Sequence, residues 1–166
     1  MTIKELIAKL CRKKQSTENT KAIHAKDSLG IKGEKLAVNH LKEKGFKIIG
    51  ERVHIGIDEL DIIAIDFSNP MTEQIVFVEV KTRSSNLYGG GKAAVDKRKR
   101  KAIVRAAKGY MKANFSKPHA IRFDIIEVTK AEPHSDTFEI THHINAIALP
   151  KEIIASGLCK TDLRKR

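Results

Sequence analysis

Residues 75–83, IVFVEVKTR, are the clearest strand candidate in the sequence, and they carry charged side chains. The run is apolar and largely β-branched up to Glu79, a composition typical of strands. Side chains alternate between the faces of a strand, so Glu79 and Lys81 share one face. Val78 and Val80 share the other. Burying an acid and an amine at the end of an apolar strand costs free energy, so these residues are expected there only if a function requires them. A functional site is therefore expected at this end of the strand.

The preceding apolar run, ELDIIAID at residues 59–66, places a second acid, Asp61, on a neighbouring strand. The Asp61 and Glu79 carboxylates and the backbone carbonyl of Val80 would supply the hard oxygen ligands that Mg²⁺ takes while keeping several waters. Such an ion assists phosphodiester hydrolysis, and Lys81 would steer the water or offset charge on the phosphate. An ordinary cross-strand salt bridge is the alternative, because an aspartate followed by E-x-K arises by chance on many amphipathic strands. These residues alone leave both interpretations open.

Length and composition indicate one globular domain with a strongly basic charge balance. The 166 residues are 41% hydrophobic, which is enough for a core and too much for a disordered chain. Lys and Arg number 32 against 20 acids, and the net charge of +12 favours a polyanionic partner, with nucleic acid first. No apolar stretch approaches the roughly 18 residues of a membrane span, and charges at Lys4, Glu5 and Lys9 interrupt any signal-peptide core. We therefore expect a cytoplasmic protein without a transmembrane segment. The separated cysteines, Cys11 and Cys159, form no metal-type pair.

Three regions follow from the pattern along the chain. Residues 1–27 are expected to form an amphipathic helix and a polar linker, a docked or mobile appendage. The apolar face of this helix consists of Ile3, Leu6, Ile7 and Leu10. A membrane-surface or partner-protein anchor is the other interpretation of that face. Residues 28–150 are expected to form the compact domain, and residues 151–166 a polar, basic tail.

Helix and strand signals within the compact domain predict a mixed sheet. Asp27 or Ser28 is expected to cap a first helix that ends at Gly45. Glu34 lies on the apolar stripe of that helix, either as an inward-facing acid or as an acid at the rim of the stripe. The expected strands are residues 46–53, 59–67, 74–83, 120–129 and 137–144.

A second helix is expected after the Gly-rich loop SSNLYGGG, with Asp96 as its cap. Its apolar stripe consists of Ile103, Ala106, Ala107, Tyr110 and Met111. Its first turns are KRKRK, residues 97–101. A charge run usually only solvates a helix, but the N-terminal end of a helix dipole also favours phosphate. We therefore interpret this run as a nucleic-acid contact that uses Lys97, Arg98, Lys99 and Arg100.

Several ordered blocks of the sequence resemble the YraN-like family of small bacterial proteins, namely GIKGEKLAVNHLKEKGFKIIGER, DELDIIAID, VFVEVKTR, KAAVDKRKRKAI and RFDIIEV. That family resembles a branch of the restriction-endonuclease-like PD-(D/E)XK superfamily, near the archaeal Holliday-junction resolvases. The resemblance covers residues 28–147 and implies a three-layer α/β fold, in which helices flank a mixed sheet of about five strands. The N-terminal helical appendage lies outside it. The resemblance also implies a Mg²⁺-dependent endonuclease, with Mn²⁺ as a substitute, that acts on DNA, including branched or structured DNA.

The resemblance assigns roles to individual residues. It makes Glu34 the acid of the first helix, Asp61 and Glu79 the metal ligands, and Lys81 the catalytic lysine. Arg52 and Lys99 match basic positions before the acidic hairpin and at the start of the second helix. Arg83, at the end of the strand that carries Lys81, joins the residues expected to contact nucleic acid.

Two positions depart from the family pattern. Asp58 stands where the family usually has glycine, so we expect a different turn before the second strand. Arg100 stands where glutamine is usual.

Two functions remain as alternatives: a Mg²⁺-dependent endonuclease acting on DNA, and a catalytically silent nuclease fold that binds nucleic acid. The complete set of acids and lysine favours the nuclease, since a decayed site would tolerate losing these costly residues. A homodimer is one option for the assembly.

Overall fold

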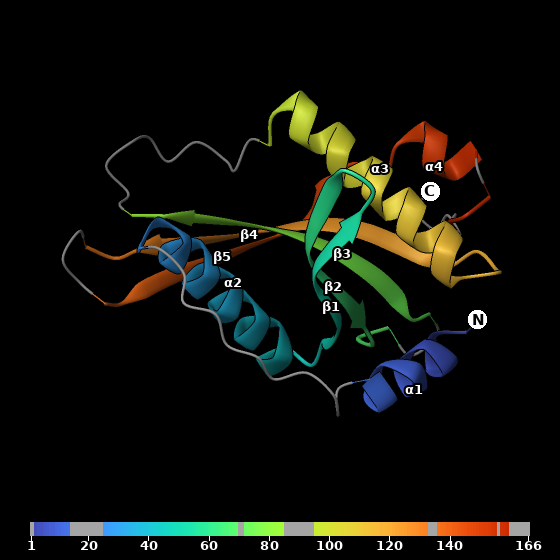
Figure 1. Ribbon diagram of the computed structural model, residues 1–166, viewed down its shortest axis with the longest axis horizontal. Coiled ribbons are helices and arrows are strands. Elements are labelled where there is room, and N and C mark those ends of the chain that lie inside the picture. The colour runs from blue at the N-terminus through green and yellow to red at the C-terminus, as the bar shows by residue number, and fades with distance from the viewer. Residues whose placement is uncertain are drawn as a thin grey trace.

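A mixed β-sheet of five strands forms the centre of the protein (Figure 1). The computed structural model describes residues 2–13, 25–69, 72–84, 95–132, 136–155 and 157–159. Strand order follows the chain, and neighbouring strands are antiparallel except for β3 and β4, which are parallel. The strands are β1 Lys47–Ile55, β2 Asp58–Asp66, β3 Gln74–Arg83, β4 Ala120–Lys130 and β5 Phe138–Ile147.

Helices cover both faces of the sheet and give three layers (Figure 1). α2, Ala25–Glu43, packs on one face. α3, Lys97–Asn114, packs on the other face and provides the crossover that the parallel pair β3 and β4 needs. α1, Ile3–Lys13, and α4, Lys151–Ala155, pack on the same side as α3. The predicted fold class, three layers around a mixed five-stranded sheet, is confirmed.

Side chains of β2 and β3 alternate between two apolar clusters, one on each face of the sheet. On the α2 face, Ile62, Val76 and Val78 pack with Ala37 and Leu41. The α3 face takes the intervening residues Ile63, Ile65, Ile75 and Phe77. Both strands are therefore buried on two sides, which explains their nearly continuous apolar sequence.

The ends of the long helices follow mostly from local sequence signals. Gly45, at φ 82°, ends α2: its N–H donates to the Lys42 carbonyl, and the N–H of Phe46 donates to the Leu41 carbonyl. At the start of α3, the Asp96 carboxylate accepts a hydrogen bond of 2.7 Å from the backbone N–H of Lys99, as predicted for a cap. The expected cap of α2 was wrong, because the helix begins at Ala25 and contains both Asp27 and Ser28.

β1 and β5 extend two or more residues beyond their expected ends, and each extension has a cause in the structure. β1 continues to Ile55 because a turn of only two residues, Gly56 and Ile57, connects it to β2. β5 continues to Ile147 across a shift in its register with β4, where Asn145 has φ 55° and donates its N–H to Asp124. Such an irregularity interrupts the alternation of side chains, so the alternating pattern in the sequence ends before the strand does.

Both ends of the chain contribute to the core on the α3 side. Ile3 and Leu6 of α1 are buried there, so this helix is docked on the sheet. Residues 151–166 were expected to be a polar tail, yet Ile153 of α4 is only 1% exposed. A few apolar residues in a short basic segment give no clear periodic signal, which is why the sequence did not predict this helix. Among the described residues, none of the helices combines the length and apolar character needed to span a bilayer.

Candidate functional site

The candidate site lies where β2 and β3 separate. Their ladder runs from Asp66 and Gln74 to Ile62 and Val78, and the next residue on each strand is Asp61 or Glu79. Oδ2 of Asp61 accepts a hydrogen bond of 2.8 Å from the backbone N–H of Val80. The carboxylate thus occupies the gap between the strands and faces Glu79.

Asp61 and Glu79 form a close pair of carboxyl groups, in which Glu79 is buried and Asp61 is partly buried. Glu79 is 7% exposed, and this burial, together with the charge of Asp61, raises the pKa of Glu79 to about 7. Burial also raises the pKa of Asp61, against the opposing effect of the Val80 N–H. Two buried acids in contact are stable only when a proton or a cation reduces their charge.

One cation in contact with this pair comes from the first turn of α3. The ammonium of Lys99 lies 3.0 Å from Oε2 of Glu79. Burial works against the charged amine, but the hydrogen bond to Glu79 and the charges of Glu79 and Asp61 raise the pKa of Lys99 overall. Lys99 is one of the residues predicted to contact nucleic acid, and the structure places its ammonium against Glu79 while 39% of its side chain stays exposed. Its spacing within KRKRK gave no signal of this.

Glu34 approaches the same region from α2, on the rim of the site. Burial raises the pKa of Glu34, and the charge of Asp61 adds to that effect, while Arg52 opposes it. Arg52 lies 3.7 Å from Glu34 and 3.0 Å from Glu59, so it bridges α2 and β2. Its φ of 49° is unusual for a residue with a side chain and places it in the left-handed region.

Gly33 sets the distance between α2 and the end of β3. A Cβ atom at Gly33 would overlap the side chain of Thr82, so only glycine allows this approach. The position of Glu34, the next residue, depends on the same contact.

Replacing Gly33 with alanine should therefore destabilise the protein by about 1–3 kcal/mol, the usual cost of overpacking. Thermal unfolding measures this loss. Gly30→Ala, on the same helix, is the control, since no atom lies within 4 Å of its added Cβ, and it should be neutral or stabilising. Adding Thr82→Ala to the Gly33 variant should recover part of the loss. Equal melting temperatures for the Gly33 and Gly30 variants would contradict the tight packing.

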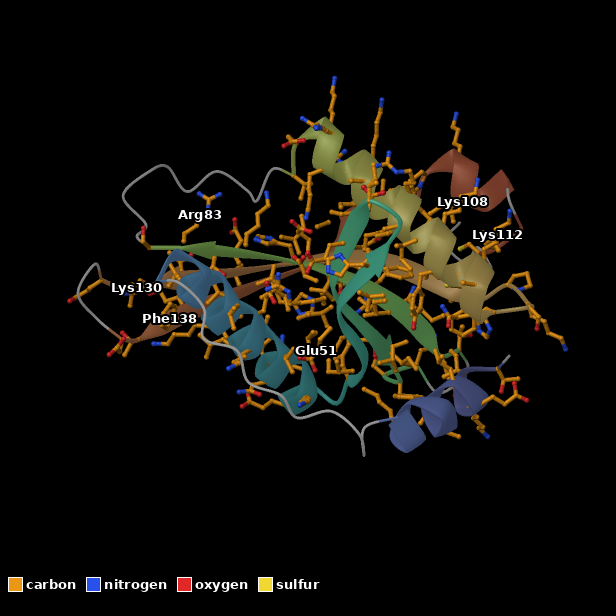
Figure 2. All side chains as sticks on the ribbon, in the orientation of Figure 1. Glu51, Arg83, Lys108, Lys112, Lys130 and Phe138 are labelled. Carbon is orange, nitrogen blue, oxygen red and sulfur yellow. The ribbon has the colours of Figure 1, made fainter. Side chains whose placement is uncertain are left out.

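The other predicted residues lie around the pair rather than in it. The charge of Lys81 contributes to the lowered pKa of Asp96, whose main cause is the N–H of Lys99, so Lys81 lies towards the start of α3. Arg83, at the end of β3, lies 3.7 Å from Glu127 (Figure 2). The remaining predicted contacts, on the open side of the first turns of α3, are exposed: Lys97, Arg98 and Arg100.

The sequence did not predict a strong ion pair between the β1–β2 hairpin and α3. Arg105 donates from Nε and Nη2 to the two carboxylate oxygens of Asp58, at 2.6 Å each. Asp58 is the position at which a departure from the family pattern is expected from the sequence. The departure therefore ties the hairpin to the helix, through two residues 47 positions apart.

Another buried charge cluster lies at the opposite end of β2 and β3. Arg122 donates to Asp66 at 2.6 Å and to Asp124 at 3.0 Å. Asp124 also contacts His142 at 3.0 Å and accepts the N–H of Asn145. Each acid of this cluster contacts a guanidinium group directly, so the cluster fits a structural role. Asp61 and Glu79, by contrast, face one another.

The donor chemistry of the carboxyl pair fits a hard divalent cation. Within the described parts of the chain, no group of three or more His, Cys, Asp or Glu side chains is placed to hold a metal. An ion here would take the two carboxylates and fill its remaining positions with backbone carbonyl oxygen and water, which suits Mg²⁺. It would also reduce the repulsion between the two carboxylates.

Comparison with known proteins gives one family. A family model described as "Uncharacterised protein family UPF0102" matches residues 33–128, which include the residues of the site. A UPF0102 protein of Caldanaerobacter subterraneus is 42% identical over 119 residues, covering 72% of this chain and 93% of the relative. A UPF0102 protein of Clostridioides difficile is 41% identical over 114 residues, covering 69% and 91%. One of Mycobacterium avium is 40% identical over 114 residues, covering 69% and 85%.

Proposed function

The chain belongs to the UPF0102 family, and from that premise we propose that it is a Mg²⁺-dependent nuclease that hydrolyses phosphodiester bonds in DNA. The observation that carries the proposal is the close pair of Asp61 and the buried Glu79 at the fork between β2 and β3, the point where their ladder ends after Ile62 and Val78. Placing a buried acid next to a second acid is unfavourable for folding, so a function that needs both is the best reason for the arrangement.

Each residue around the carboxyl pair would have a separate role in the reaction. Asp61, Glu79 and the carbonyl of Val80 would hold Mg²⁺, and the Val80 N–H keeps the Asp61 carboxylate in one orientation. Mg²⁺ when bound supplies Lewis-acid stabilisation of the phosphate charge and a more acidic water. Lys81, two residues beyond Glu79 on the same strand, would stabilise charge on the phosphate. Glu34 and Arg52 would fix the rim of the site next to the entering strand.

The surface of α3 would hold the DNA backbone. The helix carries eight lysines and arginines and no acid. It begins at the carboxyl pair, because Lys99 of its first turn touches Glu79. A strand of DNA lying along α3 would therefore bring a phosphate to the fork.

A catalytically silent module that binds nucleic acid is the second candidate, and one contact favours it. The ammonium of Lys99 already lies 3.0 Å from Glu79, so part of the negative charge is compensated without a metal. A protein that had lost metal binding could keep its fold in this way, with α3 still available for phosphate.

Metal binding separates the two candidates. If Asp61 and Glu79 hold the ion, saturating Mn²⁺ or Mg²⁺ should stabilise the native state by about 2–3 kcal/mol at a hundredfold excess over Kd. This corresponds to a rise in melting temperature of about 5–10 °C for a domain of this size. Thermal melts with Mn²⁺, Mg²⁺ and chelator measure the rise, and Asp61→Asn should remove it.

Cleavage is tested with labelled duplex, single-stranded and four-way-junction DNA under the same metal conditions. The nuclease is expected to cut at least one of these substrates with Mn²⁺ or Mg²⁺ and none with chelator. A protein that binds these DNAs, does not respond to either metal in its melt and cuts none of them would be the binding module.

A further inference from the structure

The tip of the β1–β2 hairpin presents an isolated apolar side chain to solvent. Ile57 is 93% exposed, the highest value among the large hydrophobic residues that the structure describes. It is the second residue of a two-residue turn whose first residue, Gly56, has φ 62°. Turns of this kind usually have Gly followed by Asn, Asp or Ser, so the turn itself does not require a β-branched residue. Local structure therefore does not explain Ile57.

The tip is held against α3 by an ion pair and by a close packing contact. Asp58, the next residue, accepts both hydrogen bonds from Arg105. Ile55, on the other side of the turn, lies so close to Gly109 that a Cβ there would be 2.6 Å from its Cγ2 atom. Figure 1 shows the hairpin rising from the sheet to the middle of α3. An apolar group on a fixed support loses little conformational freedom when it binds a partner.

Positive charge lies on the α3 side of the tip. Arg105 is 60% exposed beside it, although its guanidinium pairs with Asp58. Lys108 and Lys112 continue the positive charge along the C-terminal half of α3 (Figure 2). A polyanion is the partner that this charge favours, and its apolar part would have to meet Ile57.

Nucleic acid has both properties, since its phosphates are anionic and an unstacked base exposes an apolar face. Aliphatic side chains, isoleucine included, are known to insert between bases and unstack them. Ile57 lies four residues from Asp61 along the chain, about 13 Å at the rise of a strand. This equals about four base-pair steps of 3.4 Å each, so both residues can contact one DNA molecule.

We propose that Ile57 is a wedge that contacts an unstacked base a few nucleotides from the carboxyl pair. The inference rests on the proposed function and specifies its substrate class: DNA with a base that is unpaired or easily unstacked, as at a fork. Arg105 and Asp58 position the wedge, and the cations of α3 hold the flanking phosphates. Perfect duplex DNA would bind through its phosphates alone and more weakly.

A forked DNA with 2-aminopurine at the branch tests the wedge without any cleavage. The fluorescence of this base rises when it leaves the stack, and chelator keeps the DNA intact. Wild-type protein is expected to raise the signal, and Ile57→Ser should abolish the rise. The same substitution should weaken binding to the forked DNA about fivefold to tenfold and change binding to duplex DNA less than twofold, both measured by fluorescence anisotropy.

Ile144→Ser is the matched control, because Ile144 is 61% exposed on β5, at the other edge of the sheet. It should leave both signals unchanged. Ile57→Phe should keep the fluorescence rise, since it keeps an apolar wedge. A rise that persists in Ile57→Ser, or an equal loss in the Ile144 variant, would overturn the proposal. So would unchanged DNA binding together with a loss of self-association, which would make the tip a protein contact.

Failure of the wedge can be told from failure of the nuclease. If wild-type protein unstacks the base but cuts no DNA, the wedge is retained and the nuclease is rejected. If wild-type protein cuts DNA and Ile57→Ser raises the 2-aminopurine signal of the forked DNA as wild type does, the nuclease is retained and the wedge is rejected. If the wild-type protein raises no 2-aminopurine signal, the wedge is rejected whatever the cleavage result.

Discussion

Replacing Asp61 or Glu79 with the corresponding amide is expected to abolish metal-dependent cleavage, with a fall in rate of at least about 10³-fold. A loss of this size corresponds to about 4 kcal/mol of transition-state stabilisation, the scale of a bound metal's contribution. The amides keep the size of the side chains and remove the charge that an ion needs. Single-turnover cleavage of the preferred DNA substrate, with Mn²⁺ and with Mg²⁺, measures the effect.

The same substitutions should not unfold the protein. Burial and mutual repulsion make the two acids unfavourable, so the melting temperature without metal should stay the same or rise. Glu51→Gln is the control for the loss of a nearby charge, because Glu51 is an exposed acid of β1 (Figure 2). Its cleavage rate should be unchanged. Cleavage that survives Glu79→Gln at the wild-type rate would assign the activity to another site or to a contaminant.

Neutralising the open side of α3 should produce the second large effect, a fall in DNA affinity of about 10²- to 10³-fold at 0.1 M salt. The variant replaces four exposed cations with glutamine: Lys97, Arg98, Arg100 and Lys101. Each lost phosphate contact makes the slope of log K against log salt less steep by about 0.9, so a change of about 3–4 is expected. The loss should be similar for all DNA sequences, because phosphate contacts carry no base information. Fluorescence anisotropy over a salt series measures both quantities.

Lys99 is kept in this variant because it contacts Glu79, and its removal would change the carboxyl pair as well as the surface. A control with the same loss of charge replaces four exposed lysines of α2, the following turn and the start of β1: Lys35, Lys42, Lys44 and Lys47. α2 covers the face of the sheet opposite α3, so this control should lower affinity much less. Equal losses in the two variants would show that only net charge matters and that α3 is an ordinary solvated surface.

The fold could be predicted largely from local signals. Alternation in IVFVEVKTR predicted the strand and placed Glu79 and Lys81 on one face of it, because side chains of a strand alternate whatever their partners. Asp96 and Gly45 gave helix ends, since a cap depends on atoms within a few residues. The expected end of a strand was wrong where a residue from another element determines the backbone, as at the irregularity of β5 next to Asp124.

The sequence by itself determined which acids lie on neighbouring strands and that α3 is basic, because both depend on spacing along the chain. Only the tertiary structure decided that the β2–β3 ladder stops at Ile62 and Val78, so that Asp61 meets Glu79 at a fork. The contact of Lys99 with Glu79, and that of Asp58 with Arg105, 47 residues away, likewise depend on the tertiary structure. These contacts depend on how the crossover helix packs on a twisted sheet. Packing of that kind is set by side chains from several distant segments at once, and no periodicity along one segment records it.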